Sequence, residues 1–228
     1  PGPFNKSISV TSNCEPATST IRFTGKVQEK PKTIADLYPR QIGALNLTTN
    51  HLSMMKVKNT EVKTDSVGMA NLSDKPVTIS FRNVPEYITV KAIPETLKPN
   101  QTGSIVVSYD GKKKNDWGFL MDKVTLALNG ETNNNNFQLS ISATIEEDFS
   151  KYTEAELTKA PKIVFENTDY NFGTIKEGEK AAYAFVYKNE GKKDLIIRKT
   201  TTSCGCTVVN SKKDVLKPGE KSEIQVTF

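Results

Sequence analysis

The chain has few of the residues that most often carry catalysis or bind metals. Its 228 residues include one histidine, three cysteines and one tryptophan. The sequence contains no Gly-X-Ser-X-Gly nucleophile motif, no His-Glu-X-X-His zinc motif and no glycine-rich phosphate-binding loop. Such a sequence does not supply the usual groups for hydrolytic chemistry. We therefore expect no enzymatic activity and no cofactor.

Long apolar segments are also missing. No run approaches the ~20 apolar residues that a membrane-spanning helix needs, so we expect no membrane-spanning segment. Hydrophobic residues make up 36% of the chain and charged residues 25%. This balance is typical of folded globular domains with polar loops, and the chain is long enough to bury a core.

The excess of positive charge is small and lies in short clusters. The formal net charge is +5. Many of the lysines stand beside turn residues, in the segments DGKKKND, NEGKKD and NSKKD. A nucleic-acid-binding surface combines basic residues with interleaved aromatic residues or a reading helix, and these clusters have neither. We expect them to be solvated loop tips and expect no nucleic-acid partner.

The most informative feature is an internal repeat. The segment that begins at Leu45 aligns without a gap with the segment that begins at Ile163, at an offset of 118 residues. Further on, LKPNQTGSIVVSY from Leu97 matches LKPGEKSEIQVTF from Leu216 at an offset of 119. Equivalent positions then carry similar side chains: Leu52 and Tyr170, Met54 and Phe172, Val57 and Ile175, Val67 and Phe185, Asn71 and Asn189. The sequence is therefore a duplication.

The same comparison explains the first residues of the chain. GPFNKSISVTSN from Gly2 aligns with GFLMDKVTLALN from Gly118, and IRFTGKV from Ile21 aligns with LSISATI from Leu139. Residues 1–27 are therefore predicted to be the last two strands of a unit whose first half is absent.

Each unit consists of short runs in which apolar and polar residues alternate, separated by turn clusters every ~8 to 12 residues. This pattern is typical of half-buried strands in a β-sandwich. The predicted fold class is all-β, with tandem immunoglobulin-like β-sandwich domains, one complete and two truncated. The predicted map is: closing strands of a truncated domain at 1–27, a linker at 28–44, a complete domain at 45–145, a linker with a helical turn at 146–162, and a domain lacking its last strands at 163–228.

The last unit has features of a known family. These are Phe172-Gly173, Glu177-Gly178-Glu179, Asn189 with Gly191, Cys204-Gly205-Cys206-Thr207, and Pro218-Gly219. With these features, residues 163–228 resemble the family catalogued as domain of unknown function 1573, Hydin-like immunoglobulin modules that are frequent in envelope proteins of the Bacteroides group. The resemblance implies an extracytoplasmic location, in the periplasm or at the cell surface. It also implies a non-enzymatic role as a structural spacer or as a protein-interaction and adhesion module.

Turn chemistry gives several of these residues scaffold roles. Asn189 and Gly191 suit a turn whose residues need a positive φ. Pro218 and Gly219 fit a turn before the final strand. Gly173 is likewise expected to be a turn and scaffold residue.

Cys204 and Cys206 carry an alternative function, that of a thiol redox or metal-handling protein. In an extended strand their Cα atoms would lie ~6.6 Å apart, at the long edge of the range for a disulfide. The pair could be buried structural thiols, a strained redox pair, or a site for Cu(I). A zinc site needs about four ligands, and Cys14 and His51 fall in other units. Packing is the favoured interpretation.

Trp117 is the candidate for an interaction residue. It follows a lysine cluster at the start of a strand, where an exposed aromatic ring could bind another envelope protein or a surface glycan. The favoured alternative is a tryptophan buried at the end of a strand.

The two truncated units are complementary. The last unit lacks the closing strands that residues 1–27 resemble, and unpaired strand edges recruit other strands. We therefore expect head-to-tail self-association of this chain, by a contact that need not close into a ring.

Overall fold

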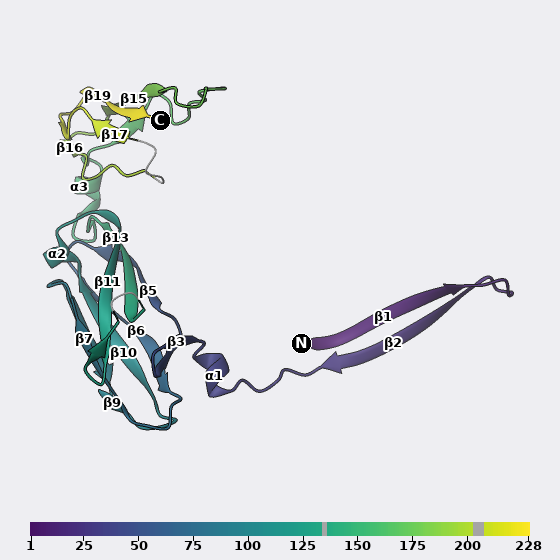
Figure 1. The fold of residues 1–228 in the computed structure, drawn as a ribbon. Coiled ribbons are helices and arrows are strands. Elements are labelled where there is room, and N and C mark those ends of the chain that lie inside the picture. The colour runs from purple at the N-terminus through teal and green to yellow at the C-terminus, as the bar shows by residue number, and fades with distance from the viewer. Residues whose placement is uncertain (134–135, 203–207) are drawn as a thin grey trace.

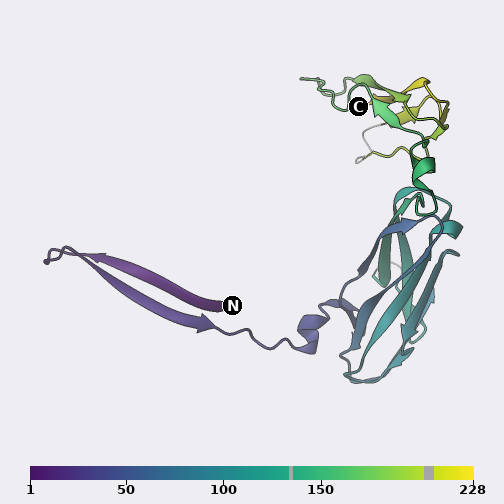
Figure 2. The same ribbon diagram turned by 180° about the vertical axis from the view of Figure 1, so that it is seen from behind.

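The computed structural model describes residues 1–133, 136–202 and 208–228. They form three successive parts, which we call the N-terminal hairpin (residues 1–27), the middle unit (residues 40–146) and the third unit (residues 163–228) (Figures 1 and 2). Strands dominate each part, and the described helices are single turns. The predicted all-β fold class is confirmed.

The N-terminal hairpin consists of β1 (Gly2–Thr11) and β2 (Thr18–Val27), which pair antiparallel along their whole length. Among the described strands, none from another part of the chain pairs with either. Figure 1 shows the hairpin projecting away from the rest of the chain. Apolar and polar residues alternate along both strands, as they do in half-buried strands, yet the large apolar side chains of the hairpin are exposed.

The middle unit is a sandwich of two sheets. One sheet has the order β3 (Arg40–Ile42), β4 (Leu45–Leu47), β6 (Val62–Asn71), β10 (Thr102–Asp110), β8 (Ile88–Ile93). The other has the order β5 (His51–Lys58), β13 (Gln138–Glu146), β11 (Gly118–Leu128), β7 (Val77–Arg82), β9 (Thr96–Leu97), with β12 (Glu131–Thr132) paired to β11. All these pairs are antiparallel except β5 with β13, which is parallel.

The core of the middle unit lies between these sheets. Alternate residues of β10, β11 and β13 point inward, and their side chains are buried: Ile105, Val107, Val124, Leu126, Leu139, Ile141. Each buried aliphatic side chain contributes at most ~1.5–3 kcal/mol relative to an exposed one. The apolar residues of the alternating pattern that predicted the strands therefore also form the core.

The structure differs from the predicted linker at residues 28–44. Residues 40–42 form β3, which pairs with β4, and Ile42 is buried in the core. A segment of three residues after a proline is too short to show an alternating pattern, so no sequence pattern indicated this strand. Before β3, the short helix α1 (Ile34–Leu37) begins with a capping box formed by Thr33 and Asp36.

The third unit follows the short helix α3 (Glu154–Leu157), which falls in the predicted linker where a helical turn was expected. One sheet has the order β14 (Ile163–Phe165), β15 (Ala182–Asn189), β19 (Lys221–Thr227), β17 (Val208–Ser211). A second sheet pairs β16 (Leu195–Ile196) with β18 (Val215–Leu216). The buried core of this unit, within the described residues, is small: Tyr187, Leu195, Leu216.

Helices contribute little elsewhere. The remaining short helix is α2 (Gly111–Lys114), which connects β10 to β11. Across residues 1–133, 136–202 and 208–228, no helix has the length and apolar character needed to cross a membrane.

Candidate functional site

Charged and aromatic side chains gather at the end of the middle unit that faces the third unit. The site begins at α2, where the Asp110 side chain caps the helix by accepting hydrogen bonds from the backbone N–H groups of Lys112 and Lys113, each 3.0 Å. Asn115 ends the helix with a left-handed backbone, φ 48°. This short helix places Lys114 against β11.

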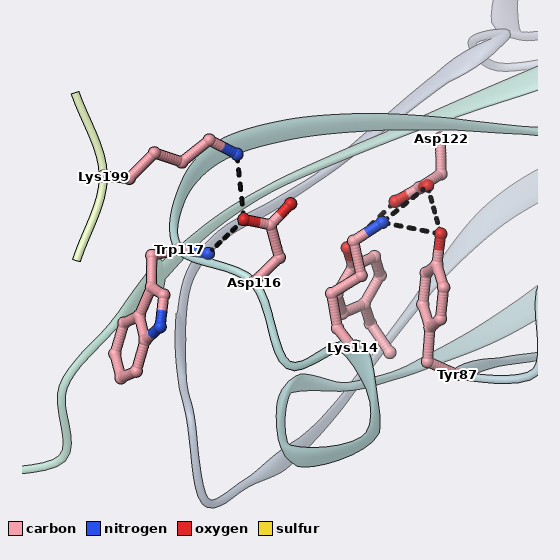
Figure 3. Close-up of polar contacts among 7 residues, drawn as sticks. Tyr87, Lys114, Asp116, Trp117, Asp122 and Lys199 are labelled. Atoms are coloured by element: carbon pink, nitrogen blue, oxygen red, sulfur yellow. Dashed lines mark hydrogen bonds and ion pairs between the residues drawn. The ribbon is translucent and has the colours of Figure 1, made fainter. Parts of the chain in front are cut away.

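Lys114 lies in a polar cluster with one aspartate and two tyrosines. Its Nζ atom lies 3.2 Å from Asp122 Oδ1 and donates a hydrogen bond of 2.7 Å to the Tyr87 hydroxyl (Figure 3). The Tyr87 hydroxyl donates to Asp122 Oδ1, and the Tyr109 hydroxyl donates to Asp122 Oδ2 at 2.9 Å. Asp122 therefore accepts hydrogen bonds from three side chains.

The cluster shifts the pKa of its members. Burial raises the pKa of Tyr109 above its usual range, and the hydrogen bond to Asp122 adds to the shift. Burial and the same carboxylate also raise the pKa of Tyr87. Burial alone would lower the pKa of Lys114, but its bonds to Tyr87 and Asp122 outweigh burial and raise it. The three groups therefore hold their protons more tightly in the folded chain.

We expect the middle unit to lose stability at alkaline pH. A raised folded-state pKa stabilises the fold fully below the unfolded-state pKa, here 10.0 for tyrosine and 10.5 for lysine, and this contribution is lost as pH rises through the folded-state pKa. The melting temperature should fall from about pH 10 upward, and Tyr109→Phe should make that fall shallower. A melting temperature that does not change over this range in the wild-type chain would contradict this.

Directly after this cluster the chain contacts the third unit. Asp116 Oδ1 accepts hydrogen bonds from the Trp117 backbone N–H, at 2.7 Å, and from Lys199 Nζ, at 2.9 Å (Figure 3). The hydrogen bond from Lys199 lowers the pKa of the Asp116 carboxyl. Arg198 Cζ lies 4.6 Å from the centroid of the Trp117 ring. Trp117 itself is partly buried and packs against the core of the middle unit.

Arg198 also binds the carboxylate of Glu147, which directly follows β13 of the middle unit. Its Nη2 and Nε atoms lie 3.0 Å and 3.2 Å from Glu147 Oε2. We call Asp116, Trp117 and Glu147 on one side, with Arg198 and Lys199 on the other, the junction. The guanidinium is thus held between an aromatic face and a carboxylate, a geometry that lysine cannot reproduce.

A cavity of about 430 Å³ lies beside the junction, between α3 and β16. Its lining is mainly apolar and includes Phe149, Tyr152, Leu157, Ile163 and Ile196. The linker therefore does not fill the space between the units completely.

Two of the proposed scaffold glycines have the backbone that their residue type favours. Gly219 adopts φ 82° in the turn before β19, and Gly173 adopts φ 64°. The counterpart of Gly173 in the middle unit is Met55, with φ 55°, at the point where the register of β5 shifts against β13. The Phe172-Gly173 pair therefore corresponds to the β-bulge of the middle unit, and glycine at this position avoids the steric cost that methionine bears.

The expectation of a positive φ for Asn189 and Gly191 is wrong, because neither residue adopts one. Asn189 is fully buried, and its Nδ2 atom donates to the carbonyl oxygens of Lys193 and Leu216, at 2.8 Å and 3.0 Å. Its Oδ1 atom accepts from the backbone N–H groups of Gly191 and Lys162. Gly191 is required for space instead, since a Cβ atom there would lie 2.3 Å from the Ala160 carbonyl oxygen.

The middle unit repeats this arrangement. Asn71 is also fully buried and donates from Nδ2 to the carbonyl oxygens of Lys75 and Leu97, at 2.7 Å and 3.0 Å. Its Oδ1 atom accepts from the backbone N–H and the hydroxyl of Ser73. The sequence repeat aligned Asn71 with Asn189, which indicated that the two residues have equivalent roles. The sequence does not show that both side chains point inward.

Sequence reasoning also missed Lys114, which was expected at a solvated loop tip. Its neighbours Lys112 and Lys113 are exposed, but the Lys114 side chain is largely buried in the polar cluster. Trp117 packs on the core of the middle unit, and its ring also contacts Arg198 of the same chain. Binding of another envelope protein or a glycan by Trp117 stays a prediction.

The cysteine hypothesis concerns Cys204 and Cys206, which lie outside the described residues. Cys14 is free and exposed. Within the described part of the chain, no group of three or more histidine, cysteine, aspartate or glutamate residues is placed to hold a metal ion.

The fold and the junction define a class of protein: tandem immunoglobulin-like β-sandwich units joined by specific side-chain contacts. Residues 163–228 match the model of the family described as protein of unknown function (DUF1573). A search of curated proteins found no match to the chain.

Among solved structures, the chain is similar to the crystal structure of a protein of unknown function from Porphyromonas gingivalis W83. The TM-score is 0.57 at 13% identity, covering 81% of this chain and 83% of that one. This likeness shows the fold alone. The CsuC–CsuE chaperone–tip adhesion subunit complex of Acinetobacter baumannii gives a TM-score of 0.32 at 11% identity, covering 78% and 88% of the two chains, which is too low to carry an argument.

Proposed function

We propose that this chain is a non-enzymatic, extracytoplasmic envelope protein that acts as a spacer, holding successive immunoglobulin-like units in a defined orientation. The observation that carries the proposal is the junction, where Arg198 and Lys199 of the third unit contact Trp117, Glu147 and Asp116. A flexible linker between independent domains would not need such contacts. The resemblance of the third unit to envelope modules supports the proposed extracytoplasmic location.

The junction contacts are individually modest and act together. A cation over an aromatic ring contributes ~0.5–1 kcal/mol at an exposed site and more when it is desolvated. Exposed ion pairs contribute ~0–1 kcal/mol each. The Arg198 and Lys199 side chains point from adjacent residues to separate partners, Trp117 with Glu147 and Asp116. Two anchors at different points restrict rotation between the units more than a single anchor could.

Trp117 is the single tryptophan of the chain, so its fluorescence reports on the junction. Arg198→Ala should shift the Trp117 emission to longer wavelength and increase quenching by acrylamide, because the guanidinium no longer covers the ring. Arg40→Ala, which removes an exposed arginine from β3, is the matched control and should change neither. The expected loss of junction free energy is ~0.5–1 kcal/mol. Identical fluorescence in the wild type and in Arg198→Ala would contradict the proposal.

A further inference from the structure

A second cavity, of about 420 Å³, lies at the same end of the middle unit as the polar cluster. Its walls come from the turn between β5 and β6, from α2 and the loop that follows it, and from one residue of the linker before α3. The volume is within the range of cavities that bind small molecules. The polar and aromatic side chains in its lining include Asn59, Lys112, Asn115, Asp116, Trp117 and Lys151.

The walls of this cavity are held by contacts that need no ligand. The Asp148 backbone N–H donates to Asn59 Oδ1 at 2.9 Å, and the Thr60 hydroxyl donates to the Asp148 carboxylate. A Cβ atom on Gly111 would lie 2.4 Å from the Lys58 carbonyl oxygen, so the glycine lets α2 pack directly on the end of β5. The cavity is therefore preformed, which reduces the entropy that is lost when a ligand binds.

Two lysines in the lining have no carboxylate partner. Within the described part of the chain, Lys112 and Lys151 form no ion pair, and both are exposed. By contrast, the nearby Lys114 lies 3.2 Å from Asp122 Oδ1. The two ammonium groups of the lining are therefore available to an anionic group of a ligand.

The lining also offers hydrogen-bond acceptors. Asp116 Oδ1 accepts from the Trp117 backbone N–H and from Lys199, whereas Oδ2 has none of the drawn contacts (Figure 3). The side-chain amides of Asn59 and Asn115 can both donate and accept. A sulfate ion brings no donor for these acceptors. A ligand that matches the whole lining carries hydroxyl groups as well as a negative charge.

We propose that this cavity binds an acidic saccharide, with one uronic acid residue as the smallest ligand. The carboxylate of the sugar pairs with Lys112 and Lys151, and its hydroxyl groups donate to Asp116 and bond to the asparagine amides. The C–H groups of the sugar ring pack against the indole of Trp117, which is apolar over most of its surface. An extended peptide matches less well, because the lining residues lie in turns, loops and α2 and offer no strand edge for pairing.

This binding site does not depend on the spacer role. Asp116 and Trp117 also belong to the junction, but Lys112 and Lys151 contact neither Arg198 nor Glu147 in the described structure. The substitutions that test the site are confined to lysines outside the junction. Failure of saccharide binding and failure of the spacer proposal are therefore separate results.

Titration of the 228-residue chain with D-glucuronate tests the proposal. Because the chain has one tryptophan, its heteronuclear NMR spectrum contains one indole N–H signal, which reports on the cavity without further assignment. This signal should shift to saturation with a Kd of ~1 mM, in line with the binding energy per atom of typical small ligands. D-glucose, which lacks the carboxylate, should bind at least about tenfold more weakly. Acetate and sulfate, which lack the ring hydroxyls, should give no saturable shift.

Three results of this titration would overturn the proposal. The first is the absence of a saturable shift with D-glucuronate up to ~50 mM. The second is equal affinity for D-glucose, which would show that the charge is not recognised. The third is equal affinity for acetate or sulfate, which would show a site for simple anions instead of a saccharide.

Paired lysine substitutions locate the binding site. Lys112→Ala with Lys151→Ala should weaken D-glucuronate binding by about tenfold or more, because two charge-assisted hydrogen bonds are lost. The matched control, Lys113→Ala with Lys159→Ala, removes the same charge from α2 and the linker, at exposed positions outside the lining, and should bind as the wild type does. Wild-type affinity in the first variant, or an equal loss in both variants, would overturn the assignment of the site.

Discussion

Replacing Asn71 with alanine should lower the free energy of unfolding of the middle unit by about 3 kcal/mol. The side chain satisfies the buried carbonyl oxygen of Leu97 and bonds to both Lys75 and Ser73. Each buried polar group left without a partner costs ~1–3 kcal/mol. Chemical denaturation followed by the fluorescence of Trp117 measures this change, since the single tryptophan packs on the core of the same unit.

The control is Asn50→Ala, which removes an exposed asparagine from the same unit and should change stability by no more than ~0.5 kcal/mol. Asn71→Asp should be destabilising as well, because a carboxylate oxygen would then face the carbonyl oxygens. Equal stability of Asn71→Ala and Asn50→Ala would contradict the structural role given to this side chain.

Replacing Asp122 with alanine should lower the stability of the middle unit by about 2–4 kcal/mol. The change leaves Lys114 largely buried without its carboxylate and removes the acceptor for the hydroxyls of Tyr87 and Tyr109. Breaking a buried ion pair by removing one partner costs ~3–5 kcal/mol when burial is complete. Because this ion pair is not completely buried, the expected loss of unfolding free energy is slightly smaller.

A double-mutant cycle with Lys114→Met separates the ion pair from the tyrosine bonds. The coupling energy between Lys114 and Asp122 should lie within ~0.5–3 kcal/mol. Asp74→Ala, at an exposed loop position, is the control and should have little effect. If Asp122→Ala were as stable as Asp74→Ala, the polar cluster would contribute nothing to the fold.

The fold could be predicted because its determinants are local or repeated. Alternation of apolar and polar residues predicted strands, and the repeat predicted that equivalent segments, such as those starting at Leu97 and Leu216, form equivalent strands. Strand β3 was missed because three residues cannot display a period of two. The extent of β16 was also unpredictable, because strand formation depends on a neighbouring strand to accept its hydrogen bonds.

The site was less predictable because its contacts join distant residues. Lys114 was assigned to a solvated tip on the basis of its neighbours, and only the fold shows that Asp122 lies beside it. Trp117 and Arg198 are 81 positions apart in the sequence, and no local sequence pattern predicts their contact. A positive φ was expected for Asn189 because asparagine shortly before glycine is typical of a turn. Its buried side chain instead forms hydrogen bonds with the backbone of neighbouring segments.

Small-angle X-ray scattering, extrapolated to zero concentration, tests the spacer proposal most directly. The wild-type chain should fit a single arrangement of the middle and third units, with variation confined to the N-terminal hairpin. Arg198→Ala combined with Lys199→Ala should give a broader distribution of arrangements and a larger radius of gyration, whereas Arg40→Ala should match the wild type. A wild-type profile that already requires a broad distribution of unit orientations, and that these two substitutions leave unchanged, would contradict a spacer held by the junction.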